Sequence, residues 1–381
     1  MANVFTALAP VLFSAAQEIS SEPFGVISAI SGSFDDKQVA RGDVVKVPIA
    51  SGGVPADFEP ANVPPQGDSD TAGEVDVRIT ASKKRSWHMT GEQRRSLENA
   101  GTDKEWLRQK VMQEMRALRN AAEADCAQAI VEGASRACGA AGVTPFATSL
   151  DDLISVRKIL KDNGAPMADL QFVCDTAAEA NLLKLATIQQ AYAAGSDEER
   201  RQGRIGRQFG FGISNSAQLL PHTKGTGINY LVNAATPMAI GDEGTVLSTA
   251  SGTGTILAGD ILTFAADSAN KYVANGGVNA IAQQLILGRP GARKGIPVSN
   301  AITVGASYTP SLAFERGAVV GIMRPPVMPA NPTMSQAMIC DAQGLSYLII
   351  EIAQYGQVSW ELHLAWGFRV VQSEHVAILL G

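Results

Sequence analysis

The side chains that most often carry out chemistry are few in this chain and lie far apart in its sequence. The chain has four histidines and four cysteines: His88, His222, His363, His375, Cys126, Cys138, Cys174 and Cys340. No two histidines have the spacing of a helical zinc motif, and no two cysteines form a C-x-x-C pair. This pattern predicts buried, reduced thiols and no metal site. His363 alternates with Glu361 and Ser359 on the polar face of a predicted strand, which predicts a solvated or hydrogen-bonded histidine there.

The motifs that bind phosphate or activate a serine are also missing. The sequence contains neither a G-x-x-x-x-G-K-[ST] loop nor a G-x-S-x-G elbow. The stretches 225–227 and 252–254 read Gly-Thr-Gly but lack the third glycine of a dinucleotide site, so we expect turns there. We therefore expect no catalytic residue, no cofactor and no metal, and hence no enzyme. A site assembled from distant residues stays open at this stage.

Composition and charge narrow the class of protein. The net charge of −6 argues against a chain that binds nucleic acid by overall electrostatic attraction. The apolar stretch from Val4 to Ala16 has no basic residue before it, since the first is Lys37, so it does not read as an export signal. No run reaches the roughly 18 apolar residues of a membrane span. We expect a non-membrane protein whose 381 residues form more than one core.

Two elongated elements occupy the stretch from residue 43 to residue 132. The first is a hairpin with strands at Asp43–Ile49 and Glu74–Thr80, in which every second residue is Val or Ile. The second is a helix from Asp103 to Glu132, about 45 Å long, with a predicted capping box at Thr102 and Glu105. Its apolar stripe is Leu107, Val111, Met115, Leu118, Ala122, Cys126 and Ile130. A lone hairpin is marginal in water, so we expect the chain to lie against copies of itself.

Charge is distributed unevenly along the hairpin. Its tip, Ser51 to Gly73, contains four acidic residues and no Lys or Arg, whereas the returning side is basic. A solvated basic face is one interpretation. The other is that the tip of one copy meets the base of the next, because complementary patches set register and partner choice. The candidate inter-subunit residues are Asp57, Phe58, Glu59, Asp68, Asp70, Lys83, Lys84 and Arg85.

The rest of the chain predicts an α/β stretch followed by a β-rich one. We expect a helix capped by Ser149 that ends at Asn163-Gly164, a buried strand at Leu170–Cys174, and a helix opened by a capping box at Thr176 and continuing to Gln190. A charged loop follows, with Arg200, Arg201, Arg204 and Arg207. Gly, Thr, Ser and Asn dominate residues 225–310, which predicts a β-rich module.

The last strands show two apolar faces. Leu348, Ile350 and Ile352 share one face, and Trp360, Leu362, Leu364 and Trp366 share another. A hairpin turn is expected at 354–357.

The order of these parts resembles the phage major capsid (coat) proteins of the HK97-like fold, and within them the P22-like coat protein family. The likeness runs through nearly the whole chain in the stretches Met1–Asn3, Gly42–Pro48, Phe209–Thr223, Gly259–Phe264, Leu312–Pro326 and Trp366–Ala377. The resemblance implies an α+β fold with an N-terminal arm (1–42), an extended hairpin loop (43–90), a peripheral domain with a spine helix (91–146), the first part of an axial domain (147–224), an inserted β-rich domain (225–312) and return strands (313–381).

The resemblance also implies a function and partners. The chain would form hexamers and pentamers of an icosahedral head around double-stranded DNA, with a separate scaffolding protein, a portal and possible decoration proteins. It would be assembled in the host cytoplasm and belong to the virion. No lysine lies between Lys46 and Lys83, so the lysine crosslink of some relatives has no donor in the tip. No long charged helical segment precedes the arm, so we expect no fused scaffold. A shell around protein cargo and a soluble α/β enzyme remain as alternatives.

Overall fold

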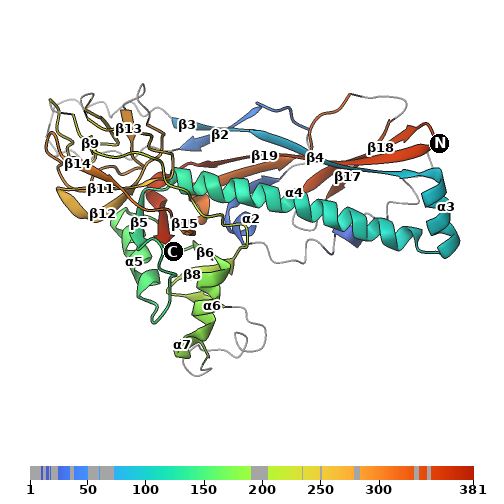
Figure 1. Ribbon diagram of the computed structural model, residues 1–381, viewed down its shortest axis with the longest axis horizontal. Helices are drawn as coiled ribbons and strands as arrows, with labels where there is room; N and C mark the ends of the chain where they lie inside the picture. Colours follow the sequence, from blue (N-terminus) through green and yellow to red (C-terminus); the bar gives the residue numbers. More distant parts are fainter. Residues whose placement is uncertain are drawn as a thin grey trace.

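The computed structural model describes most of the chain in an elongated arrangement, with one long helix running along it (Figure 1). The described residues are 10–11, 14–16, 18, 25–34, 38–49, 60, 73–189, 205–233, 235–248, 251–278, 284–329, 334–340 and 345–381. Helices and strands are mixed and several sheets are present, so the expected α+β class is confirmed.

The long helix, α4 (Asp103–Gly133, 31 residues), follows the apolar stripe expected from the sequence. All seven stripe residues are buried, and the first five pack against the tryptophans of the six-stranded sheet that lies beside α4. The expected capping box at Thr102 is wrong, because the Thr102 side chain makes no cap hydrogen bond. A capping box stands instead at Thr90 and Gln93, where it opens a short helix, α3 (Gly91–Ala100). Gly101 ends α3 with a φ of 70°, so the chain re-enters a helix only two residues later.

A six-stranded sheet lies beside α4. Its order is β1 (Ser31–Phe34), β16 (Val319–Arg324), β19 (Gln357–Val370), β18 (Ser346–Gln354) and β17 (Met334–Cys340), and β4 (Ala81–Thr90) pairs with β19. The β18–β19 turn forms at 354–357, as expected, with Gly356 at a φ of 70°. Leu348 lies opposite His363, whereas Trp360 lies opposite Glu351. Glu351 is an odd number of positions from Leu348, so the two predicted apolar sets face opposite sides of the sheet.

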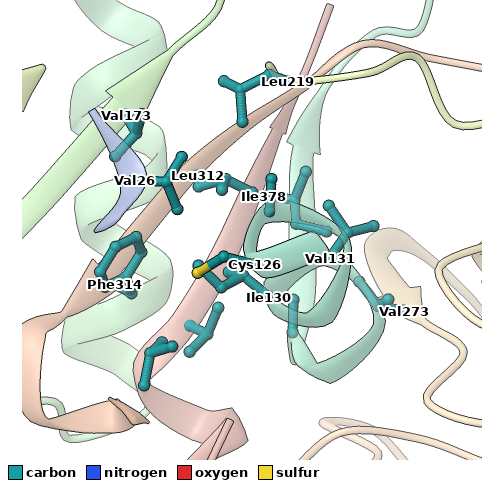
Figure 2. Close-up of a cluster of buried hydrophobic side chains, with 14 of the residues drawn as sticks. Val26, Cys126, Ile130, Val131, Val173, Leu219, Val273, Leu312, Phe314 and Ile378 are labelled. Atoms are coloured by element: carbon teal, nitrogen blue, oxygen red, sulfur yellow. The ribbon is translucent and has the colours of Figure 1, made fainter. Parts of the chain in front are cut away.

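A ten-stranded sheet continues from the other end of α4. Its order is β7 (Arg207–Gln208), β8 (Phe211–Asn215), β6 (Leu170–Cys174), β15 (Pro310–Glu315), β20 (Val376–Leu380), β5 (Arg136–Gly139), β12 (Asp267–Val273), β11 (Ile261–Phe264), β14 (Ala301–Val304) and β9 (Tyr230–Leu231). Figure 2 shows the C-terminal half of α4 seated on this sheet, where Cys126 and Ile130 meet Leu312, Phe314 and Ile378. Turns of 3-10 helix at Arg316–Ala318 and Ser373–His375 link the two sheets.

The helices beside this sheet begin where expected but are capped differently. In α5 (Asp151–Asp162) the N-cap is Leu150 and makes no side-chain bond, while Ser149 Oγ accepts only from the Asp151 amide. In α6 (Thr176–Lys184) the cap is Asp175, which accepts from the Ala177 amide at 3.1 Å. The helix expected to reach Gln190 breaks at Leu185 and resumes as α7 (Ala186–Gln189).

The β-rich stretch and the arm both join these sheets. Residues from 230 to 302 form a hydrophobic cluster of their own, around Phe264, Tyr272 and Leu285, and include a small sheet of β10 (Gly244–Val246) and β13 (Gln284–Ile286). In the arm, a short helix α2 (Val26–Ala29) packs on α4, and β1 adds to β16 in parallel. The arm is therefore part of the body from Val26 to Phe34.

Candidate assembly surface

The hairpin predicted from the sequence is present as β2 (Val44–Ile49) and β3 (Gly73–Arg78), paired from Val44–Arg78 to Ile49–Gly73. Its burial decreases away from the body. Val77 and Ile79 are buried against Ile322 and Ala365, whereas Ile49 and Val75, farther out, are only half buried. One end of the hairpin is thus part of a core, and the other end lies away from it (Figure 1).

Backbone contacts hold the base of the hairpin on β19. A Cβ atom on Gly367 would lie 2.1 Å from the carbonyl oxygen of Arg78, so only glycine lets the two backbones come this close. The Thr80 amide donates to the carbonyl of Trp366 at 3.1 Å, and Arg369 Nη1 donates to the carbonyl of Asp76 at 2.9 Å. These contacts fix the direction in which the hairpin leaves the subunit.

The basic residues predicted to meet a neighbour all have a carboxylate partner in their own chain. Lys83 Nζ lies 3.2 Å from Asp125, Lys84 Nζ 2.7 Å from Glu361, and Arg85 Nε 2.6 Å from Glu114. All three side chains are also about half exposed to solvent, so both the solvated basic face and the contact with a neighbour stay open. Among the described residues they neutralise acids of α4 and β19.

The acidic half of the predicted contact cannot be placed. Asp57, Phe58, Glu59, Asp68 and Asp70 lie outside the described residues, as do Arg200, Arg201 and Arg204 of the charged loop. Contact between tip and base therefore stays a prediction.

Glu114 is the most buried of the acids paired with β4. Its side chain is 5% exposed and also accepts from Lys110 Nζ at 2.6 Å. Burial alone raises the pKa of this carboxyl, but the hydrogen bonds and charges of Lys110 and Arg85 outweigh it, and the pKa is lowered. The pair Arg85–Glu114 thus ties the strand that follows the hairpin to the middle of α4.

A second buried acid on α4 holds the arm. Glu123 is 3% exposed, and its Oε1 accepts from the amide of Val26, the first residue of α2, at 2.8 Å. Burial raises the pKa of Glu123, while hydrogen bonds from Val26 and Ser216 and the charge of Arg119 lower it by less. The helix that carries the core stripe therefore also fixes the position of the arm.

Two of the four histidines, His222 and His363, are engaged in structural contacts. His222 Nε2 lies 2.9 Å from Asp260, whose carboxylate also accepts from the amides of Gly225 and Leu257. The fully buried Asp260 side chain thus joins the turn at 257–260 to Gly225 at the start of the β-rich stretch. Sequence reasoning missed this role, because the two residues are 38 positions apart and follow no known motif. The turns expected at the Gly225 and Gly252 stretches are wrong. The two stretches lie against each other instead, with the Gly227 amide donating to the carbonyl of Thr255 at 2.8 Å and Ile228 bridging Thr253.

His363 is hydrogen-bonded, which is one of the two states expected from the sequence, and it is not solvated. Its Nε2 lies 3.1 Å from Glu361, and the residue is buried. Burial lowers the pKa of His363 more than Glu361 raises it, so the ring is neutral at physiological pH.

The thiols are structural as well. Burial raises the pKa of Cys138 and of Cys174 to about 12, and it also raises the pKa of Cys126. All four cysteines are free, as a reduced protein requires. Cys340 is exposed, so the expected burial is wrong for this cysteine. Within the described residues, no group of three His, Cys, Asp or Glu could hold a metal ion. In the same part of the chain no helix is long and apolar enough to cross a membrane.

Comparison with known proteins gives matches only among solved structures. No family model matches the chain, and no curated protein matches it. The capsid structure of the cyanophage P-SCSP1u matches with a TM-score of 0.48 and 11% identity over 94% of this chain and 88% of that one. A Mycobacterium phage Che8 structure gives 0.46 and 14% over 89% and 84%. A virus-like particle from Pyrococcus furiosus gives 0.46 and 10% over 97% and 98%.

All three TM-scores are below 0.5, and these matches do not single out the P22-like family. The function is therefore argued from the arm, the hairpin and α4.

Proposed function

We propose that this chain is the major capsid protein of a phage, a structural protein that assembles into hexamers and pentamers of an icosahedral head around double-stranded DNA. The observation that carries the proposal is the hairpin β2–β3. It is fixed to the body at one end and offers six-residue strands that pack on little of their own subunit beyond the base. A second copy can supply the surface that completes it.

The chemistry of the described side chains supports a structural protein over an enzyme. His222 serves Asp260, His363 serves Glu361, and the buried thiols have raised pKa values. These two histidines and the buried thiols are thus engaged in holding elements together. Helix α4 joins the two sheets as a single rod, which suits a subunit that must keep its shape in a lattice.

The finer parts of the proposal follow the resemblance seen in the sequence. The hairpin would be the extended loop of residues 43–90, α4 the spine of the peripheral domain, 147–224 with the return strands the axial domain, and 225–312 the inserted domain. The tip acids would meet a basic neighbour. Lys83, Lys84 and Arg85 already have carboxylate partners in their own chain. In that contact each cation would therefore be shared between its own carboxylate and one from the neighbour's tip.

The partners proposed are further copies of the chain, a separate scaffolding protein, a portal, possible decoration proteins and DNA held without sequence recognition. The particle would form in the host cytoplasm and become part of the virion. Scaffold dependence is tested by expressing the chain alone. Aberrant or open shells support it, and uniform closed shells of virion size refute it.

The size of the purified protein tests the function itself. A shell protein gives particles of megadalton mass in light scattering and closed shells in negative-stain images, whereas an enzyme gives a small oligomer. Nuclease treatment of particles from producing cells then separates the two kinds of shell. Protected DNA supports a phage head, and protein contents without DNA support the cargo-enclosing alternative.

A further inference from the structure

The exposed edges of the six-stranded sheet and of the hairpin differ in how they are protected against pairing with another strand. An unpaired edge strand offers a row of amide and carbonyl groups to any other strand, and proteins block such edges with Lys, with Pro or by keeping them short. Strand β4, which pairs with β19 alone among the strands that the structure describes, carries three consecutive basic residues at 83–85. Strand β2 of the hairpin carries Lys46 and Pro48, and β1 has only four residues.

Strand β17 has none of these protections. It is the end strand of its sheet, and among the described strands only β18 pairs with it. Its seven residues, Met-Ser-Gln-Ala-Met-Ile-Cys, include no charge, no proline and no glycine. The pairing with β18 runs without interruption from Met334–Ile352 to Cys340–Ser346, so no bulge turns the edge away. Met338 is 48% exposed and Cys340 is exposed. By the usual rule this is an edge built to pair.

The sequence of β17 is compatible with a second copy of itself. In an antiparallel pair centred on Ala337, Ser335 lies opposite Ile339 and Gln336 opposite Met338. Residues an even number of positions apart point to the same face, so each residue keeps its side of the sheet in both copies. Ile339 then stays on the core side in both chains, and Met338 and Gln336 stay on the outer side. The uncharged strand places no like charges opposite each other.

We propose that β17 of one subunit pairs antiparallel with β17 of a second copy about a two-fold axis, joining two six-stranded sheets into one. This inference rests on the proposed shell and names one contact within it. The hairpin strand β2 is a poorer partner for β17, because Pro48 has no amide to donate and Lys46 carries a charge. A two-fold contact of this kind uses the same residues on both sides and closes on itself.

Disulfide trapping tests the pairing directly. With Cys340 replaced by Ser, the variant Ala337→Cys places one thiol at the two-fold centre, where opposite Cα atoms lie at about 4.5–5.5 Å, within the range of a disulfide. We expect assembled shells to give a covalent dimer on a non-reducing gel after mild oxidation, and unassembled subunits to give little. The matched control is Ser86→Cys on the protected edge strand β4, which is exposed and should give no dimer.

Two results would overturn the pairing while leaving the proposed function standing. One is normal shells of the Ala337→Cys variant with no more dimer than Ser86→Cys. The other comes from Met338→Lys, which adds the missing charge at an exposed position and should reduce shell yield several-fold. Its control is Ile240→Lys, at a residue 72% exposed. Equal yields from the two lysine variants, with equal far-UV circular dichroism, would also exclude the pairing. A wild-type chain that forms no shells at all would instead remove the proposed function.

Discussion

Gly367 of β19 lies directly under the carbonyl of Arg78 in β3, at a distance that leaves no room for a side chain. We expect Gly367→Ala to push the hairpin off the sheet and to destabilise the subunit by about 1–3 kcal/mol, as overpacking does. Urea unfolding measures the loss. Gly91→Ala is the control, because the nearest atom to its new Cβ would be 3.9 Å away. Similar stabilities for the two variants would show that the hairpin base is not held by this contact.

The hairpin tip should serve assembly and not folding. Because Ile49 pairs with Gly73, an Asn-Gly turn can replace residues 50–72 with the strands kept in register. Shortening a loop costs little, so the subunit should fold with unchanged stability. It should form no stable shells in light scattering and negative-stain images. Particles of wild-type yield and stability would refute the overlap.

Two of the basic residues of β4, Lys83 and Arg85, should differ in their effect on stability. Glu114 is 5% exposed at its side chain, whereas Asp125 is 41% exposed. Arg85→Ala takes a cation from a buried carboxylate and should cost about 1–3 kcal/mol. Lys83→Ala breaks an exposed pair and should cost about 0–1 kcal/mol. Equal losses in urea unfolding would contradict this order.

Acid titration adds a second measurement on the same pair. The lowered pKa of Glu114 means that its contribution is present above the ordinary glutamate pKa and is lost as pH falls through the lower folded value. Arg85→Ala should therefore move the acid unfolding midpoint to higher pH. An unchanged midpoint would mean that Lys110 alone keeps the carboxylate charged.

Glu123 should show the opposite pH dependence. Its pKa is raised by burial, so the folded state holds the proton more tightly, and stability falls as pH rises from the unfolded pKa through the folded one. In Glu123→Gln this decline should disappear, because the amide oxygen still accepts from Val26 and carries no charge. The measurement is urea unfolding from about pH 4, near the ordinary glutamate pKa, to about pH 8. It compares Glu123→Gln with Glu98→Gln on the exposed helix α3. A decline of the same size in both variants would exclude Glu123 as its source.

The particle should be held together without covalent links. Boiling in detergent should give one band near the chain mass of 39.9 kDa, with or without reductant. Three of the cysteines are shielded, and in the proposed β17 pair the exposed Cys340 lies opposite Met334 of the second copy. A ladder of multimers would refute both the missing lysine donor and the reduced thiols.

Local patterns in the sequence predicted the elements better than their ends. The stripe from Leu107 to Ile130 located α4, and alternation located the hairpin, because both periodicities reflect burial on one side. A short apolar run located the buried strand β6. The cap at Thr102 failed because the residue has a φ of −110° and a ψ of 3°, outside the extended region that a capping side chain needs. Thr90 and Gln93 fit the same spacing and do form the capping box, at the start of α3.

The candidate surface was less predictable because it depends on pairs distant in sequence. The strand β4 reads as a basic run, and nothing near it shows that it pairs with β19, whose residues follow some 270 positions later by the register Trp87–Trp360. Likewise Lys84 and Glu361 are 277 positions apart. Which acids neutralise a basic run is set by the sheet and not by the run itself.

Strand β19 runs for 14 residues beside α4, with β18 along its first half and β16 along its second. A pull applied along β19 therefore loads its hydrogen bonds to β18 and β16 in shear, where many must break together and not one after another. A subunit of this kind is stiff along its length, and a container built from it would yield first at the joints between subunits when its contents press outward.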